Sequence, residues 1–243
     1  MSLTRGTRRG LLRGGSKGYG SKILATGPIA YWMLGETAGA VAYDQISSAQ
    51  NGAHTGVTLG QAGIGDGRTS PLYDGANDYT NIYSATFAAA FNGAAGTASI
   101  WFKVFNAAVW TNGAVGGMYV LQVDNNNYVR LRKSNANNQL QFWYKAGGTF
   151  ESVVAAYSAL TWTHIAITWS KAAEEMRAYL NGTQTGTTQV ALGVWAGVLI
   201  PLFSVLGASG AFGPAEPFPG YFAHAAAWDR ALTPAEIADL AVV

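Results

Sequence analysis

The chain has 243 residues, of which 49% are hydrophobic and only 12% are charged. This length suits one large β domain or two small ones. Because charged residues are so few, solubility must depend on uncharged polar residues or on burial against partner subunits. The absence of cysteine excludes a disulfide framework, a thiolate metal site and a cysteine nucleophile.

The N-terminal segment, residues 1–27, is predicted to be a basic arm rich in glycine and arginine. It has no helical or strand periodicity, so we expect it to be disordered by itself and held by a neighbouring subunit, with nucleic acid as the less favoured partner. A twin-arginine export signal is disfavoured because Gly14 and Gly15 stand where an apolar region is needed. The assembly contacts predicted for the arm are Arg5, Arg8, Arg9, Arg13, Lys17 and Lys22.

The rest of the chain, residues 28–243, reads as many short strands separated by glycine and asparagine. Frequent Asn-Gly and Asp-Gly turns between short apolar runs are typical of a β-sandwich or barrel. The predicted strands are 29–34, 72–74, 79–83, 97–105, 118–123, 128–132, 140–145, 152–156, 162–169, 176–180, 202–206 and 221–228.

The segment 162–182 carries the clearest strand pattern. Ile165, Ile167 and Trp169 alternate with His164 and neighbours that point the other way. Residues 181–182 are Asn-Gly, which favours a type I′ turn because both central residues need positive φ.

Helix is scarce in the sequence. Thr233 is a good N-cap, Pro234 suits the first helical position and Glu236 completes a capping box. A single helical turn is expected at 85–91. The uncharged run 190–207 is interpreted as core strand and loop or as a subunit interface, and its glycines and Pro201 disfavour a membrane span.

Four blocks resemble laminin-G-like domains of the concanavalin A-like lectin superfamily. They are PIAYWMLGE at 28–36, YDGANDY at 73–79, TASIWFK at 97–103, and the segment 218–237 with its AWDRALTPAEI ending. The resemblance implies an all-β, two-sheet antiparallel sandwich of the jelly-roll type with a short C-terminal helix. Trp32, Trp101, Trp169 and Trp228 are expected to fill the space between the two sheets.

Some members of this superfamily bind calcium at the sandwich rim, and an acid common in the last strand is missing here, where residues 222–224 are Phe-Ala-His. Asp124, followed by three asparagines, is the densest oxygen cluster, and a structural turn is favoured there over a metal site. We therefore expect no cofactor, with calcium as the alternative.

Glycoside hydrolases of this fold need paired carboxylates that face one cleft. The chain has no E-x-D-x-E triplet. Glu174 and Glu175 are adjacent, and Asp74 and Asp78 straddle a turn. There is also no G-x-S-x-G motif and no histidine pair at metal-ligand spacing, so we expect a protein that is not an enzyme.

A glycan site would use aromatic rings for the apolar faces of sugars and amides for their hydroxyls. Core packing for the tryptophans and turn geometry for the asparagines are the alternatives. Arg130, Arg132 and Lys133 add a small basic patch, but nucleic acid is not favoured as a ligand. The candidate residues are Trp110, Asn125, Asn126, Tyr128, Asn135, Asn137, Trp143 and Trp195.

The leading interpretation is a non-enzymatic structural or decorating subunit of a large assembly. Small lectin-like sandwiches of this composition resemble phage virion proteins of the capsid, tail or fibre, so the expected location is a virion and the expected partners are neighbouring copies. The alternative is a carbohydrate-binding adhesin or lectin module at a cell surface, and a virion protein of this kind would be compatible with glycan binding.

Overall fold

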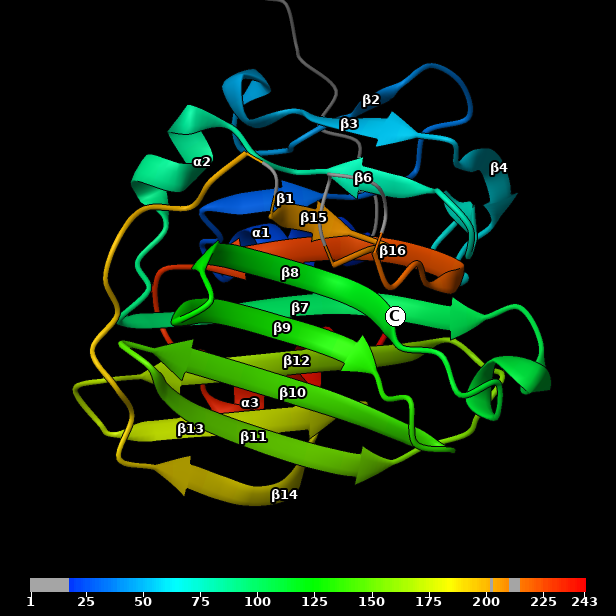
Figure 1. Cartoon of the computed structure of the whole chain (residues 1–243). Coiled ribbons are helices and arrows are strands. Elements are labelled where there is room, and N and C mark those ends of the chain that lie inside the picture. Colours follow the sequence, from blue (N-terminus) through cyan, green and yellow to red (C-terminus); the bar gives the residue numbers. More distant parts are fainter. Residues whose placement is uncertain (1–17, 202, 210–214) are drawn as a thin grey trace, which may run out of the picture.

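The computed structural model describes residues 18–201, 203–209 and 215–243. These residues form two antiparallel sheets packed face to face, as Figure 1 shows. Sheet A runs in the order β14 (Thr183–Val190), β13 (Glu175–Leu180), β12 (Thr163–Ser170), β7 (Ala95–Val104), β16 (Pro219–Trp228), β5 (Thr69–Asp74) and β4 (Thr58–Ala62), with β1 (Ala30–Trp32) also paired to β16. The all-β sandwich predicted from the sequence is confirmed.

Sheet B packs on the inner face of sheet A. Its order is β11 (Thr149–Ala156), β10 (Gln139–Ala146), β9 (Asn127–Lys133), β8 (Gly116–Asp124), β15 (Ser204–Leu206), β6 (Tyr79–Asn81), β3 (Gly52–Thr55) and β2 (Val41–Ala42). All twelve predicted strands coincide with observed ones. The strands β2, β3, β4 and β14 were not predicted.

The Asn181-Gly182 turn closes the β13–β14 hairpin, with φ of 45° and 80° at its two residues. Both angles lie in the region that a type I′ turn requires, so this prediction is confirmed. Asn181 also exchanges hydrogen bonds with the backbone of His164 on β12, at 2.8 and 3.0 Å. The turn is therefore fixed to the neighbouring strand.

The space between the sheets is filled by aromatic and aliphatic side chains. Trp32 and Trp169 lie there, together with Phe102, Tyr144 and Ile167. Trp101 and Trp228 do not. The prediction was wrong for these two residues, because they point to the outer side of sheet A, where they belong to a second apolar cluster.

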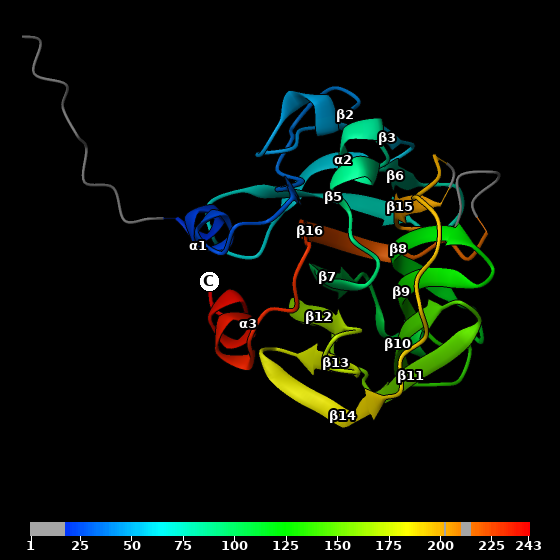
Figure 2. The same ribbon diagram turned by 90° about the vertical axis from the view of Figure 1, so that its left-hand side faces the viewer.

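This outer cluster is covered by two short helices, α1 (Tyr19–Ala25) and α3 (Pro234–Leu240). Figure 2 shows both helices on the same side of the sandwich, outside β12 and β16. α3 begins with the predicted capping box between Thr233 and Glu236. The predicted helical turn after residue 84 is also present as α2 (Ala85–Ala90), and two 3₁₀ turns, η1 (Ser48–Gln50) and η2 (Ala107–Trp110), complete the elements.

The structure corrects the predicted limit of the N-terminal arm, because residues 19–25 are helical and packed on the domain. The Tyr19 hydroxyl donates to the carbonyl of Leu240 at 2.5 Å and accepts from Trp101 Nε1 at 2.7 Å. Lys22, predicted to contact a neighbour, donates to the carbonyl of Val242 at 2.9 Å and faces Asp239 at 3.5 Å. Arg5, Arg8, Arg9, Arg13 and Lys17 lie outside the described residues.

Residues 190–201 form a strap that leaves β14 and crosses the edge of the sandwich towards β15 (Figure 1). Leu192 and Leu199 of this strap are buried, whereas Val190, Val194 and Val198 are 60%, 68% and 62% exposed. None of the helices in the described part of the chain is long and apolar enough to span a bilayer.

Candidate functional site

The outer surface of β9 and β10 carries a regular set of polar and aromatic side chains. Burial alternates strictly along both strands, as expected for strands with one face on a core. Cross-strand pairing places Trp143 beside Arg130, Gln141 beside Arg132, and Lys145 between Tyr128 and Phe150 of β11. We call this surface the aromatic face; it consists of Gln122, Tyr128, Arg130, Arg132, Gln141, Trp143, Lys145 and Phe150.

Three aromatic rings lie next to one another on this face. The ring centroids of Trp143 and Phe150 are 5.3 Å apart with an interplanar angle of 85°, and those of Tyr128 and Trp143 are 6.4 Å apart. Phe150 is 44% exposed, and Tyr128 and Trp143 are half-buried. The face therefore offers apolar ring surface to solvent in a protein that buries most of its aromatic residues.

Cations are interleaved with these rings. The guanidinium carbon of Arg132 lies 3.5 Å from the Trp143 ring centroid, and that of Arg130 lies 4.7 Å from the Tyr128 ring. Lys145 Nζ lies 5.9 Å from the Tyr128 ring. Such placements are attractive because the ring face carries partial negative charge.

Hydrogen bonds fix the positions of these cations. Arg132 Nε donates to Gln141 Oε1 at 2.7 Å, and Arg130 donates to Gln122 Oε1 at 2.6 Å. Lys145 Nζ donates to the carbonyl of Asn125 at 2.9 Å. Side chains held in this way lose little conformational entropy when a ligand binds.

The face is positively charged overall. Two described acids act on it: Glu216 lies 3.4 Å from Arg132, and Asp124 interacts with Lys145, against the three cations Arg130, Arg132 and Lys145. Burial lowers the pKa of Arg132 and Glu216 opposes the shift, but a guanidinium stays protonated at neutral pH. Aromatic rings that pack on sugar C–H groups, beside donors for hydroxyl or acid groups, are suited to a polar ring-shaped ligand.

The structure brings some of the predicted site residues together and separates the others. Tyr128 and Trp143 lie on the aromatic face, and the exposed Asn125 and Asn126 form the β8–β9 turn at one end of it. Asn135 and Asn137 are exposed in the β9–β10 turn, at the opposite end of β9.

Two predicted tryptophans pack on the core, Trp110 completely and Trp195 in part. Trp110 is 1% exposed, and its indole nitrogen donates to the carbonyl of Ala159 at 3.0 Å. Trp195 packs against Phe91 and Tyr144, with centroids 5.6 and 6.2 Å apart. The structure therefore corrects the prediction for Trp110, which offers no ring face to a ligand, and places most of Trp195 against the core.

Sequence reasoning missed Gln122, Gln141, Lys145 and Phe150 on the aromatic face. The signal that would have found two of them, Gln141 and Lys145, is the alternation of β10, in which every second residue from Gln141 is polar or aromatic. Lys133 is not part of the basic patch predicted with Arg130 and Arg132, because it is buried. Lys133 is 1% exposed and donates to Asn112, Ala114 and Ser134.

Asp124, the weak metal candidate, has the contacts of a turn residue. Its Oδ1 accepts from the Asn126 amide at 2.8 Å and from the Asn127 side chain at 3.1 Å. These bonds lower the pKa of Asp124. Across the described ranges no group of three or more His, Cys, Asp or Glu side chains is placed to hold a metal ion.

The acid pairs considered for glycosidic cleavage are engaged in local contacts. Asp78 accepts from the backbone amide of Asp74 at 2.8 Å. Glu174 pairs with Lys171 at 2.5 Å and Glu175 with Arg177 at 2.6 Å. Asp78 is thus a buried turn residue, whereas Glu174 and Glu175 belong to local ion pairs.

Residues 74–238 match the family model described as the concanavalin A-like lectin/glucanases superfamily. The chain belongs to this superfamily. The match covers more than half of the chain, from the end of β5 into α3, so the family resemblance read from the sequence is confirmed. A search of curated protein sequences finds no match.

Several solved structures share the fold of this superfamily member at low sequence identity. Domain 4 of AbnA, an extracellular GH43 arabinanase from Geobacillus stearothermophilus in complex with arabinotriose, has a TM-score of 0.63 at 16% identity; 88% of this chain and 98% of that one are covered. The CBM40 of a Ruminococcus gnavus sialidase, bound to α2,3-sialyllactose, has a TM-score of 0.56 at 14% identity, with coverage of 71% and 96%.

The binding domain of botulinum neurotoxin serotype D has a TM-score of 0.61 at 15% identity and is matched over 88% of this chain. The chain spans about half of that domain, 51% of its length. These similarities establish a shared fold with binding domains.

Proposed function

We propose that this protein is a non-catalytic glycan-binding module whose ligand lies on the aromatic face of sheet B. The observation that carries the proposal is the row of partly exposed rings, Tyr128, Trp143 and Phe150, interleaved with cations that hydrogen bonds hold in place. A row of rings on an open strand surface suits several sugar units of an extended chain better than one enclosed unit.

Two relatives of the same fold support this class of ligand. The AbnA domain was solved with arabinotriose and the CBM40 with sialyllactose. Their identity to this chain is too low to transfer a site, so the location on the aromatic face rests on the contacts of this chain alone. The cationic character of the face favours acidic over neutral glycans.

The proposal is tested with a glycan array followed by titration calorimetry of the best ligand. Trp143→Ala is expected to weaken binding at least tenfold. The matched control is Trp162→Ala, because Trp162 is also a half-buried surface tryptophan beside a cation, Lys103, whose Nζ lies 5.4 Å from its ring. Binding should stay within about twofold in this control. An array without a hit, or equal losses in both variants, would contradict the proposal.

A second candidate function is that of a subunit in a larger assembly, such as a phage virion, rather than a module acting alone at a cell surface. The observation that favours it is the strap, whose Val190, Val194 and Val198 are exposed on a segment without charge. Exposed apolar side chains grouped on one segment are typical of surfaces that a partner covers.

Light scattering after size-exclusion chromatography tests this second candidate. If the protein is such a subunit, the wild-type chain forms oligomers, and the double variant Val194→Asp, Val198→Asp loses them. Val41→Asp, at another exposed valine, is the control and retains them. Removal of residues 2–17, which keeps α1, tests the predicted role of the arm in the same assay. A monomeric wild-type chain, or oligomers unchanged by both alterations, would count against it.

A further inference from the structure

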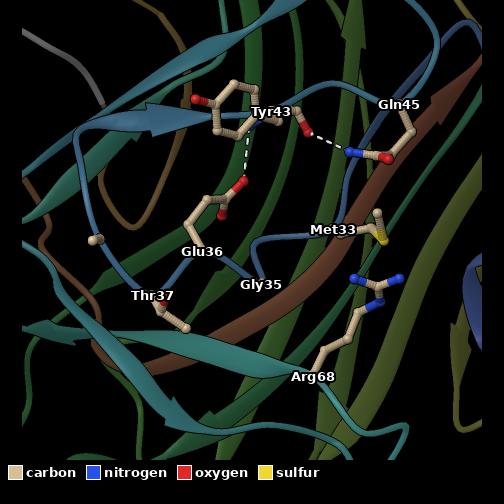
Figure 3. Close-up of a pocket in the computed structure, with 8 residues that line it drawn as sticks. Met33, Gly35, Glu36, Thr37, Tyr43, Gln45 and Arg68 are labelled. Carbon is tan, nitrogen blue, oxygen red and sulfur yellow. Dashed lines mark hydrogen bonds between the residues drawn. The ribbon is translucent and has the colours of Figure 1, made fainter.

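A pocket of about 490 Å³ lies away from the aromatic face, where the β1–β2 connection meets the start of β5. Its polar and aromatic lining comes from Glu36, Thr37, Tyr43, Gln45 and Arg68, with Met33 on one wall. Figure 3 shows these side chains arranged around one space. Its volume is within the range of small-molecule sites, which begins near 300 Å³.

Arg68 brings a positive charge to the pocket, and part of its effect is to stabilise the Asp66 carboxylate. Its guanidinium points towards Met33 and Gln45 in Figure 3, and no side chain of the described residues forms an ion pair with it. The nearest acid in sequence, Asp66, has a carboxylate that is 4% exposed and lies 3.0 Å from His224 Nε2. Its other oxygen accepts from the Arg68 backbone amide at 3.2 Å. Both oxygens of Asp66 therefore already have partners.

Glu36 supplies an acceptor. Its Oε1 accepts from the Tyr43 amide at 2.8 Å, and its Oε2 lies 3.5 Å from His54 Nε2, an ion-pair distance without hydrogen-bond geometry. Burial opposes ionisation of Glu36, but the contacts with His54 and Tyr43 outweigh it and lower its pKa. Oε2 is buried against His54 and closed to a ligand, so Oε1 is the oxygen left to face the pocket, in a side chain that is 9% exposed.

Tyr43 and Gln45 complete the lining. The Tyr43 side chain is 54% exposed, which leaves a ring face free. Gln45 Nε2 donates to the Tyr43 carbonyl at 3.0 Å, and this bond fixes the amide at the side of the pocket. A second cavity of about 310 Å³ shares Met33, Gln45 and Arg68 and extends to α1, so Arg68 lies where the two spaces meet.

We infer that this pocket is a second binding site, which takes one unit of an acidic sugar, with the ligand's carboxylate on Arg68, a hydroxyl on Glu36 and its ring on Tyr43. A guanidinium binds a carboxylate through two parallel hydrogen bonds, a carboxylate acceptor pairs with a sugar hydroxyl, and a tyrosine ring packs on sugar C–H groups. A pocket of about 490 Å³ accommodates a single unit, whereas the aromatic face extends across β9, β10 and β11. This inference does not depend on the aromatic face.

The test measures binding of glucuronate, galacturonate and N-acetylneuraminate to the full chain by ligand-observed NMR, with glucose as the uncharged match for glucuronate. At least one acid should bind, at least tenfold more tightly than glucose. Arg68→Ala should reduce its affinity at least tenfold, and Trp143→Ala should leave it unchanged. Thermal melting checks that Arg68→Ala, a change at an exposed residue, keeps the fold.

The inference is overturned if none of the three acids binds, if glucose binds equally well, or if Arg68→Ala binds the acid as the wild type does. Loss of acid binding in Trp143→Ala alone would assign the acidic sugar to the aromatic face instead. An oligosaccharide that ends in the bound acid distinguishes two sources of the ligand: competition with the free acid indicates a chain end, and lack of competition indicates a free monosaccharide.

Discussion

The two outer faces of the sandwich both carry aromatic residues, but these are covered on sheet A and accessible on sheet B. On sheet A, α1 and α3 cover Trp101, Tyr179 and Trp228, which are at most 6% exposed. On sheet B no helix covers β9 and β10 in the described structure (Figure 2), and Tyr128 and Trp143 remain partly exposed. The same residue types therefore serve as core on one face and as accessible surface on the other. The positions of α1 and α3 determine which face is covered.

The largest expected effect tests the covered face. Trp228 is fully buried, and its indole nitrogen donates to the Thr26 hydroxyl at 2.9 Å. Trp228→Ala should lower the free energy of unfolding by about 3–5 kcal/mol, because it leaves a cavity under both helices. Urea denaturation measures the change. A loss below about 1 kcal/mol would mean that the outer cluster does not stabilise the fold.

The second prediction concerns His164, which lies beneath this cluster with both ring nitrogens unpaired among the described residues. Burial lowers the pKa of His164 to about 3, and His224 adds to the shift. The unfolded chain takes up a proton below the ordinary pKa of about 6.5 while the folded chain does not, so stability is lost as the pH falls from about 6.5 towards 3.

Between pH 7.5 and pH 5 this histidine should cost the fold about 2 kcal/mol. His164→Leu removes that part of the pH dependence. Urea denaturation of wild type and variant at both pH values gives the difference, in which the other titrating groups cancel. Identical pH dependence in the two proteins would show that His164 is not buried in the neutral form.

The third prediction tests what the Tyr19 hydroxyl contributes to holding α1 on sheet A. Tyr19→Phe removes the hydroxyl that links Trp101 to Leu240 and leaves a buried donor and acceptor unpaired, at a cost of about 1–2 kcal/mol. Tyr43→Phe, on an exposed ring, is the control and should change nothing measurable. Unchanged stability of Tyr19→Phe would show that this hydroxyl does not hold α1 on the sheet.

The smallest expected effect is on the uncovered face. Trp143→Ala should change the free energy of unfolding by no more than about 1 kcal/mol, because the ring is only half-buried. Together with the large loss expected for Trp228→Ala, this would confirm that the two faces differ in role. A loss of several kcal/mol would make Trp143 a structural residue and its use as a binding platform less plausible.

Much of the fold could be predicted because its signals are local. The alternation of β9, β10 and β12, the Asn181-Gly182 turn and the Thr233 cap each depend on residues close in sequence. β14 was missed because its sequence, TQTGTTQV, has no apolar face. α1 was missed because its only signal is Tyr19 and Ile23 spaced by four in a glycine-rich context, and packing on sheet A and α3 stabilises so short a helix.

The candidate site was harder to predict for a related reason. Trp110 and Trp143 both stand beside polar residues in the sequence, but one donates to Ala159 from the core and the other lies on the surface. Which face of a sheet is covered depends on residues more than a hundred positions away. The alternation of β10 gives the direction of Trp143 relative to its neighbours, and only the tertiary structure shows that this direction leads to solvent.

The contact between Lys22 and the carbonyl of Val242 joins the beginning and the end of the described domain, 220 residues apart in the sequence. Figure 2 shows α1 and the C-terminus on the same side, outside sheet A. A fusion partner attached at either end would therefore emerge from the helix-covered side, and the module would be oriented with Tyr128, Trp143 and Phe150 pointing away from whatever carries it. Joining the two ends by a short linker and opening the chain at an exposed turn is correspondingly a practical route to a circular permutant.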